Sequence, residues 1–151
     1  MNSQNVPPLR MVRTFDAPRS VVFRWWAEAE KLQQWSGCEQ CIRCEVEMDF
    51  RVGGGFRQMM KIAVNGRVCD FVMTATYVEI VVPERICYVL DMGQQITRVD
   101  LDFSDQGART KVILTQDGFA SSESCKIVTQ GTNDSLDELS RLVTYSGMES
   151  C

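Results

Sequence analysis

The sequence contains no histidine in its 151 residues. This absence excludes the Ser-His-Asp and Cys-His nucleophile systems, zinc sites with histidine ligands and an imidazole general base. Acid–base chemistry would have to depend on carboxylates, tyrosine, lysine or cysteine with pKa values shifted by their surroundings. The lack of histidine therefore favours a binding function over an enzymatic one.

The sequence also has no excess of basic charge and no long apolar run. Sixteen Lys and Arg residues against twenty Asp and Glu give a net charge of −4, which argues against nucleic-acid binding through phosphate contacts. No run approaches the ~20 apolar residues of a membrane span, and the first ten residues lack a signal peptide's apolar segment. We therefore expect no nucleic-acid partner, no membrane insertion and a cytoplasmic location.

Seven cysteines are present, and this odd number in a chain of this length favours reduced thiols. Cys38, Cys41 and Cys44 form a C-x2-C-x2-C run, but the fourth position of a bacterial iron–sulfur motif is Met48. Alternation from Ile42 onward predicts a strand with Cys44 on the buried face and Cys41 on the opposite face, so the two would not share an ion. We expect no metal and no cofactor.

The hydrophobic pattern predicts one domain over residues 9–145, with flexible tails at 1–8 and 146–151. A strand over 9–15 leads to Asp16 and Pro18, which indicate a helix start with the Asp16 carboxylate accepting free N–H groups. A second short helix is expected over 30–35. The first helix has an apolar face with three- and four-residue steps, formed by Val22, Trp25, Trp26 and Ala29.

From Ile42 onward the hydrophobic period changes from 3.6 to 2, which predicts strands. Asn65-Gly66 is the strongest hairpin signal, since this dipeptide suits the tight turn between two antiparallel strands. The triple glycine at 53–55 opens a strand and no helix, so it indicates a turn or bulge instead of a phosphate-binding loop. The expected strands cover 42–50, 56–63, 67–79, 85–91, 95–103 and 109–116.

A long helix is predicted from about 121 to 143, and its inward stripe is unusually polar. Thr129 and Thr132 lie on the stripe, Asn133 is next to it, and Gly131 costs about 1 kcal/mol relative to alanine. Polar and small residues on an inward face indicate that it borders a cavity that supplies hydrogen-bond partners. Partial exposure of the helix is the alternative.

The predicted elements have one simple packing solution. The long helix has to fill the concave side of a twisted antiparallel sheet. The expected fold class is therefore α+β, of the helix-grip type. It comprises a curved antiparallel sheet of six to seven strands around a long C-terminal helix, with two short helices after the first strand.

A series of short motifs lies in order along residues 10–143. They are Val12-Arg13-Thr14-Phe15-Asp16-Ala17-Pro18-Arg19 with Val22-Phe23, Glu47-Met48-Asp49, Arg51-Val52-Gly53-Gly54, Phe56-Arg57, Tyr77-Val78-Glu79-Ile80, Pro83-Glu84-Arg85-Ile86, Gly118-Phe119, and Gly131 with Ser135-Leu136-Asp137-Glu138-Leu139. Together they resemble the START-like SRPBCC superfamily, in the branch of homologues of the activator of the ninety-kilodalton heat-shock protein ATPase.

The resemblance implies a cavity between the sheet and the C-terminal helix that often holds an apolar or aromatic small molecule. The chain departs from the family at two positions. The family commonly has two tryptophans before a glycine, where this chain has Trp35-Ser36-Gly37. It also commonly has a tryptophan after the helix glycine, where this chain has Thr132. The smaller side chains predict a wider and more polar pocket.

The leading interpretation is a protein that binds a hydrophobic small molecule in this cavity. Gln116 and Asn133 are expected to orient the ligand, because a buried polar group without a partner costs ~1–3 kcal/mol. The residues expected to line the cavity are Trp35, Phe56, Gln58, Met60, Met73, Tyr88, Leu90, Leu101, Phe103, Gln116, Thr129, Thr132 and Asn133.

Two other functions remain open at this point. A cyclase or hydrolase in the same cavity would need an inward carboxylate or phenol. Alternation gives only Tyr88 as an inward phenol, and Asp70 and Glu79 lie near strand ends with no predicted facing. A chaperone-associated stress-response protein with a weak contact to a heat-shock ATPase is the other alternative. Both a monomer and a homodimer are compatible with the sequence.

Overall fold

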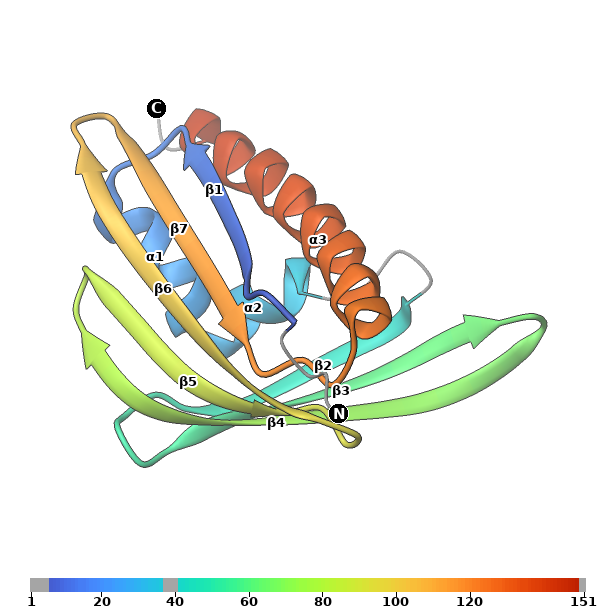
Figure 1. The fold of residues 1–151 in the computed structure, drawn as a ribbon. Coiled ribbons are helices and arrows are strands. Elements are labelled where there is room, and N and C mark those ends of the chain that lie inside the picture. Colours follow the sequence, from blue (N-terminus) through green and yellow to red (C-terminus); the bar gives the residue numbers. More distant parts are fainter. Residues whose placement is uncertain (1–5, 37–40, 150–151) are drawn as a thin grey trace.

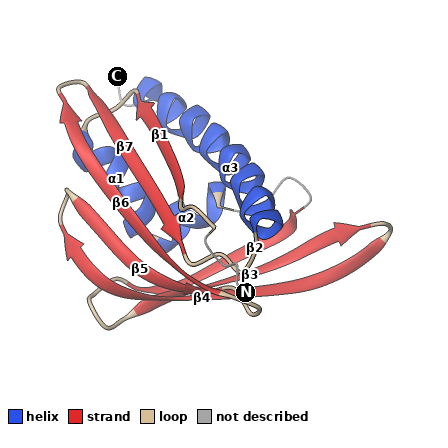
Figure 2. Ribbon diagram, viewed as in Figure 1, coloured by secondary structure: helices blue, strands red, loops and turns tan. Residues whose placement is uncertain are grey.

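The computed structural model describes residues 6–36 and 41–149, with side chains as far as Thr144. Within them, seven strands form one antiparallel sheet in the order β1-β7-β6-β5-β4-β3-β2. The sheet curls, and the helices lie on its concave side (Figures 1 and 2). This architecture confirms the predicted helix-grip class. The elements are β1 (Leu9–Phe15), α1 (Arg19–Ala27), α2 (Ala29–Trp35), β2 (Cys41–Asp49), β3 (Gly55–Val64), β4 (Arg67–Val81), β5 (Arg85–Asp91), β6 (Ile96–Gln106), β7 (Arg109–Asp117) and α3 (Ser122–Glu149).

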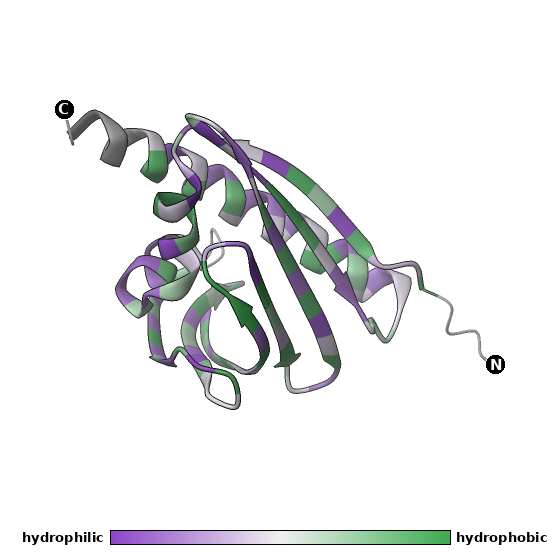
Figure 3. Cartoon of the chain, turned by 90° about the vertical axis from the view of Figure 1, so that its left-hand side faces the viewer, coloured by the Kyte–Doolittle hydropathy of each residue, from purple (hydrophilic) through white to green (hydrophobic). Residues whose placement is uncertain are grey.

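The strands follow the alternation of the sequence. Hydrophilic and hydrophobic residues alternate along them in Figure 3, as expected for a sheet with one face buried. Between β3 and β4, Asn65 and Gly66 have φ angles of 51° and 77°, the positive values of a type I′ hairpin turn. The predicted hairpin is confirmed, and it joins the two strands that extend farthest to one side in Figure 1.

Helix α1 begins differently from the prediction. Pro18 is the N-cap residue, and no side chain caps the helix. The Pro18 carbonyl accepts hydrogen bonds from the backbone N–H groups of Val21 and Val22 at 3.0 and 3.1 Å. A capping side chain has to come from the N-cap position itself, and Asp16 lies two residues earlier. The Asp16 carboxylate instead lies 3.6 Å from Arg109.

Helix α3 is longer than expected and packs against β1 and α2. It continues to Glu149, so residues 146–149 of the predicted C-terminal tail are helical, while 150–151 lie outside the described residues. Of the predicted N-terminal tail, only 6–8 are described. Among the described residues, no helix has the length and apolar character needed to cross a bilayer.

An aromatic cluster fixes α1 and α2 against one end of the sheet. The Trp26 ring contacts Trp35 edge-on at 4.8 Å between centroids and Phe103 at 5.2 Å. The Trp35 indole N–H donates to the carbonyl of Trp25 at 3.0 Å, which satisfies its polar atom in a buried position. Helix α3 packs against α2 and β1 and covers another part of the concave face.

Candidate functional site

A cavity of about 370 Å³ lies between α3 and the concave face of the sheet. This volume falls in the range of small-molecule sites. The sheet and its β5–β6 turn contribute Phe56, Gln58, Met60, Ile62, Phe71, Met73, Tyr88, Leu90, Met92, Val99, Leu114 and Gln116. The helical side contributes Trp26, Leu32, Trp35, Ser36, Ile127, Val128, Gly131, Thr132, Ser135 and Leu136.

Most of the residues expected to line the cavity do lie around it. They come from four strands, from the end of α2 and from α3, so segments distant in sequence meet at one place. No Asp, Glu, Lys or Arg is among the described residues that line it. The expected residues that the structure brings together are Trp35, Phe56, Gln58, Met60, Met73, Tyr88, Leu90, Gln116 and Thr132.

Two of the expected apolar residues are core residues instead. Leu101 is completely buried and Phe103 is 3% exposed, and neither lines the cavity. The Phe103 ring packs edge-on against Phe23 at 5.0 Å and against Trp26. Helix α1 covers this part of β6, so side chains that point inward there meet a helix and not the open space.

Two of the expected polar residues on α3 point elsewhere. The Thr129 hydroxyl donates to the carbonyl of Cys125, one turn earlier, at 2.6 Å. The Asn133 side-chain oxygen accepts from the Arg13 guanidinium on β1 at 3.0 Å, and the same guanidinium bonds Asp137 at 2.7 Å. Asn133 therefore helps to attach the helix to the edge of the sheet and does not contribute a polar group to the cavity.

Two buried glutamines supply polar atoms to the cavity wall. Gln58 and Gln116 are each 4% exposed. The Gln58 amide nitrogen donates to the carbonyl and the hydroxyl of Ser36 at 3.0 and 2.9 Å. The Gln116 amide nitrogen donates to the Thr97 hydroxyl at 3.0 Å. Both amide groups are thus held by the protein, and their nitrogens are occupied.

The prediction from sequence missed several lining residues. Met92 lies in the turn between β5 and β6, where strand alternation no longer applies. Trp26 belongs to the apolar stripe of α1, and only the packing of that helix decides that its ring reaches the cavity. Ile127 is 66% exposed and lies at the cavity mouth with Phe71, which is 47% exposed. Hydrophobic periodicity identifies inward-facing residues, so it does not reveal that an exposed apolar residue borders a cavity.

The carboxylates considered for an enzymatic role lie outside the cavity. Asp70 accepts from Lys61 at 2.9 Å on the surface of the β3–β4 hairpin. Glu79 accepts from Arg85 at 2.7 Å, in a surface group of charges that includes Asp100 and Asp102. Both carboxylates are therefore paired with cations, and neither lines the cavity.

Tyr77 is a second inward phenol, which the sequence analysis did not single out although it lies four residues after the inward Met73 on the same strand. Its side chain is 1% exposed, and its hydroxyl has no hydrogen-bond partner in the part of the chain that the structure describes. The ring packs against Phe50 and Tyr88 at 5.0 and 6.1 Å. Burial, reinforced by the neighbouring Tyr88, raises the pKa of Tyr77 well above its ordinary value, so this phenol stays neutral.

Replacing Tyr77 by phenylalanine is expected to stabilise the protein by about 1–2 kcal/mol at pH 7, because the substitution removes an unsatisfied buried oxygen. Because the folded-state pKa is raised, only the unfolded state ionises as the pH rises above ~10, so wild type loses further stability there and Tyr77→Phe lacks this loss. Urea unfolding at pH 7 and pH 11 should show a smaller alkaline loss for Tyr77→Phe. A variant less stable than wild type at pH 7 would contradict the structure here.

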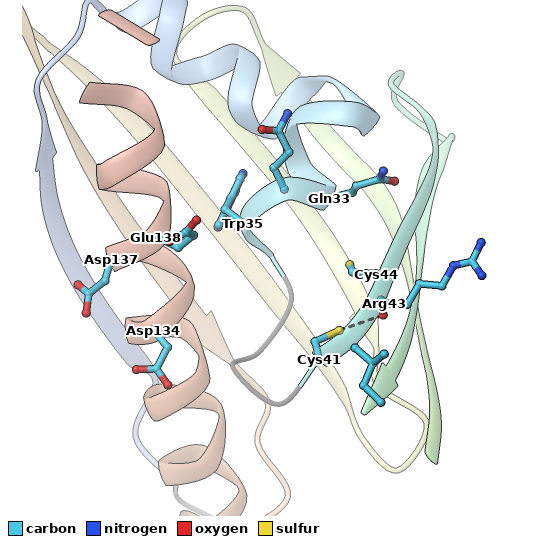
Figure 4. Close-up of a pocket in the computed structure, with 10 residues that line it drawn as sticks. Gln33, Trp35, Cys41, Arg43, Cys44, Asp134, Asp137 and Glu138 are labelled. Atoms are coloured by element: carbon cyan, nitrogen blue, oxygen red, sulfur yellow. Dashed lines mark hydrogen bonds between the residues drawn. The ribbon is translucent and has the colours of Figure 1, made fainter. Parts of the chain in front are cut away.

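A second hollow of about 460 Å³ lies outside this cavity, between the end of α2, β2 and α3 (Figure 4). It is lined by Gln33, Gln34, Trp35, Cys41, Ile42, Arg43, Cys44, Asp134, Asp137 and Glu138. Its acidic side chains belong to the outer side of α3, and Asp137 is 69% exposed. In water such groups remain solvated, so this hollow has no enclosed environment for an apolar ligand.

The two described cysteines of the C-x2-C-x2-C run lie on the same face of β2, in contrast to the prediction. Cys41 pairs with Ile62 and Cys44 with Met60, because a β-bulge at Ile42 shifts the register. The extra residue reverses the alternation on its N-terminal side. No group of three or more Cys, Asp or Glu residues suited to a metal occurs within residues 6–36 and 41–149, and Cys38 lies outside these ranges.

Comparisons with known proteins agree with the fold. Protein CV1439 from Chromobacterium violaceum is 24% identical, with a TM-score of 0.78 over 90% of this chain and 96% of that chain. The AHSA1 protein from Silicibacter pomeroyi is 20% identical, with a TM-score of 0.75 over 93% and 99% of the two chains. A putative uncharacterized protein from Rhizobium leguminosarum is 25% identical, with a TM-score of 0.72 over 92% and 95%.

A search of curated protein sequences finds no significant relative. The profile of one family, described as "Activator of Hsp90 ATPase homolog 1-like protein", matches residues 16–144. This range includes α1, α2, the strands from β2 to β7 and most of α3. It therefore covers the elements that enclose the cavity. The chain belongs to the Activator of Hsp90 ATPase homolog 1-like family, and its fold is START-like.

Proposed function

We propose that this protein binds a hydrophobic small molecule in the cavity between α3 and the sheet. The observation that carries the proposal is a cavity of about 370 Å³ whose described lining is largely apolar and contains no charged side chain. A ligand that buries apolar area there gains about 25 cal/mol per Å² removed from water. Met60 and Met73 add flexible side chains that adapt to ligand shape.

The fold supports the same function. START-like folds of this family commonly bind hydrophobic ligands. The mouth of the cavity is also apolar, since Phe71 and Ile127 are both exposed there. Exposed apolar side chains that adjoin an apolar cavity form a continuous apolar surface along which a ligand can enter. A single exposed apolar residue elsewhere would not indicate a binding site.

Binding without catalysis accounts best for the polar groups at this site. Tyr88 lines the cavity, and burial raises the pKa of its phenol above the ordinary value. A neutral phenol of high pKa is a hydrogen-bond donor and a poor general base. The surface carboxylates Asp70 and Glu79 are paired with cations and do not reach the ligand space. We therefore assign the polar groups to ligand orientation.

Filling the cavity from α3 tests the proposal. Thr132 lines the cavity, so Thr132→Trp places a large ring in it. We expect calorimetric titration with 2-methoxynaphthalene to show saturable binding to wild type, with a negative heat-capacity change and little dependence on salt. The Thr132→Trp variant should lose this binding while its denaturation midpoint stays equal or rises.

The control is Gln130→Trp, which adds the same ring on the exposed side of α3, where the Gln130 amide donates to Asp134. Binding by this variant should equal that of wild type. If Thr132→Trp lowers stability by the ~1–3 kcal/mol of an overpacked interior, the space is not available and the proposal fails. Unchanged ligand affinity in that variant would place the ligand outside the cavity.

A further inference from the structure

The side-chain amide of Gln58 has a fixed orientation. Its nitrogen lies 3.0 Å from the backbone carbonyl oxygen of Ser36 and 2.9 Å from the Ser36 hydroxyl. A backbone carbonyl only accepts hydrogen bonds, so the group that faces it has to be the NH2 and not the oxygen. Weaker contacts to the sulfur atoms of Cys44 and Met60 at 3.6 and 3.7 Å occupy the same nitrogen.

The oxygen of this amide is therefore left for a ligand. Gln58 is 4% exposed, and its Oε1 accepts no hydrogen bond from the described residues. The only fully enclosed side-chain oxygen or nitrogen without a partner among those residues is the Tyr77 hydroxyl. The Gln58 oxygen is not sealed in the same way, and Gln58 lines the cavity. Among the described residues, the wall thus presents an acceptor of fixed orientation that no donor engages, whereas Gln116 faces the Thr97 hydroxyl, which can donate as well as accept.

The charge of the site restricts the ligand further. With no charged side chain in the described lining, an ionised ligand would lose its hydration without compensation. A carboxylate would in addition face an acceptor oxygen that repels it. A neutral molecule with a hydroxyl or N–H group would satisfy Gln58, and an unmade bond at a buried acceptor is costly.

We infer that the ligand is a neutral, largely apolar molecule with a hydroxyl or N–H donor, and that Gln58 selects it by accepting a hydrogen bond through Oε1. This inference rests on the proposed function and adds the chemical class of the ligand. It distinguishes neutral alcohols, phenols and N–H compounds from ethers, hydrocarbons and fatty acids of the same size. Gln58 is the specificity-determining residue.

The test compares 2-naphthol, 2-methoxynaphthalene and 2-naphthoate by calorimetric titration at pH 7. Wild type should bind 2-naphthol about tenfold more tightly than the methyl ether, the effect of one buried hydrogen bond, and 2-naphthoate most weakly. In Gln58→Met the tenfold preference should disappear while the ether still binds. Gln116→Met, which changes the other buried glutamine, should keep the preference.

Each outcome separates this inference from the proposed function. Equal affinity of wild type for 2-naphthol and its ether overturns the inference and leaves the cavity as a binding site. Loss of the preference in Gln116→Met, with retention in Gln58→Met, overturns the role of Gln58. Absence of saturable binding by all three compounds counts against the proposed function itself. If Gln58→Met does not fold, wild type is tested instead by measuring nuclear Overhauser effects between bound 2-naphthol and the Gln58 side-chain amide. The inference predicts these effects, and their absence overturns it.

Discussion

Met60→Asp is expected to abolish binding of 2-methoxynaphthalene, with a loss of about a hundredfold or more in affinity. Met60 is 7% exposed and lines the cavity. An aspartate there would place a carboxylate among apolar side chains, with no cation in the described lining to compensate its lost hydration. A ligand that enters would remove the remaining water from the charge, so occupancy becomes unfavourable.

Met59→Asp is the matched control. Met59 is the preceding residue on β3 and points to the opposite face of the sheet, since successive side chains of a strand alternate. Both variants introduce the same charge into the same strand, so their difference measures the cavity alone. Met59→Asp should bind 2-methoxynaphthalene like wild type, as measured by calorimetric titration.

A folding check by circular dichroism accompanies the titration. If Met60→Asp does not fold, Phe71→Asp takes its place, because Phe71 pairs with Met60 across the strands and is 47% exposed at the cavity mouth. Folded Met60→Asp that binds with the affinity of wild type would show that the ligand does not occupy this cavity.

Gly55→Ala is expected to destabilise the protein by about 3 kcal/mol, the upper end of the cost of overpacking. A Cβ at Gly55 would lie 1.8 Å from the backbone carbonyl oxygen of Ala75. The obstacle is the backbone of the neighbouring strand β4, which pairs with every residue of β3. No side-chain rotation relieves such a contact, so the two strands would have to separate.

Gly131→Ala provides a comparison with the opposite sign. Gly131 lies inside α3, and its Cβ position has no atom within 4 Å. Alanine there should stabilise the protein by about 1 kcal/mol through helix propensity. In thermal unfolding, the midpoint of Gly55→Ala should be about 6–12 °C below that of wild type, and the midpoint of Gly131→Ala should be above it. A midpoint of Gly55→Ala equal to wild type would contradict the close approach of β3 and β4.

The sequence alone determined the class of the fold and part of the cavity wall. A period of 2 in hydrophobicity is a local property of a strand, so Phe56, Gln58 and Met60 could be assigned to one face without any knowledge of their partners. Asn65-Gly66 determined its turn, because few residues adopt positive φ without strain. Once one long amphipathic helix faced one antiparallel sheet, the order of the layers followed.

Only the tertiary structure decided where that local rule fails. The register of β4 shifts after Tyr77, and that of β2 shifts at Ile42. The extra residue in β2 is visible only against the partner strand, so the shared face of Cys41 and Cys44 was not predictable. Bulges depend on pairing, and pairing is not encoded in one strand's own period.

The directions in which the side chains of α3 point likewise depend on tertiary packing. Thr132 lines the cavity, while Asn133, the next residue, lies about 100° further round the helix and bonds Arg13. The rotation of α3 about its axis is set by its contacts with β1 and α2. The same holds for Gln58, whose free oxygen follows from Ser36 at the end of α2, a residue distant in sequence. The sequence supplies the residue types of a polar site, and packing decides which of their atoms face a ligand.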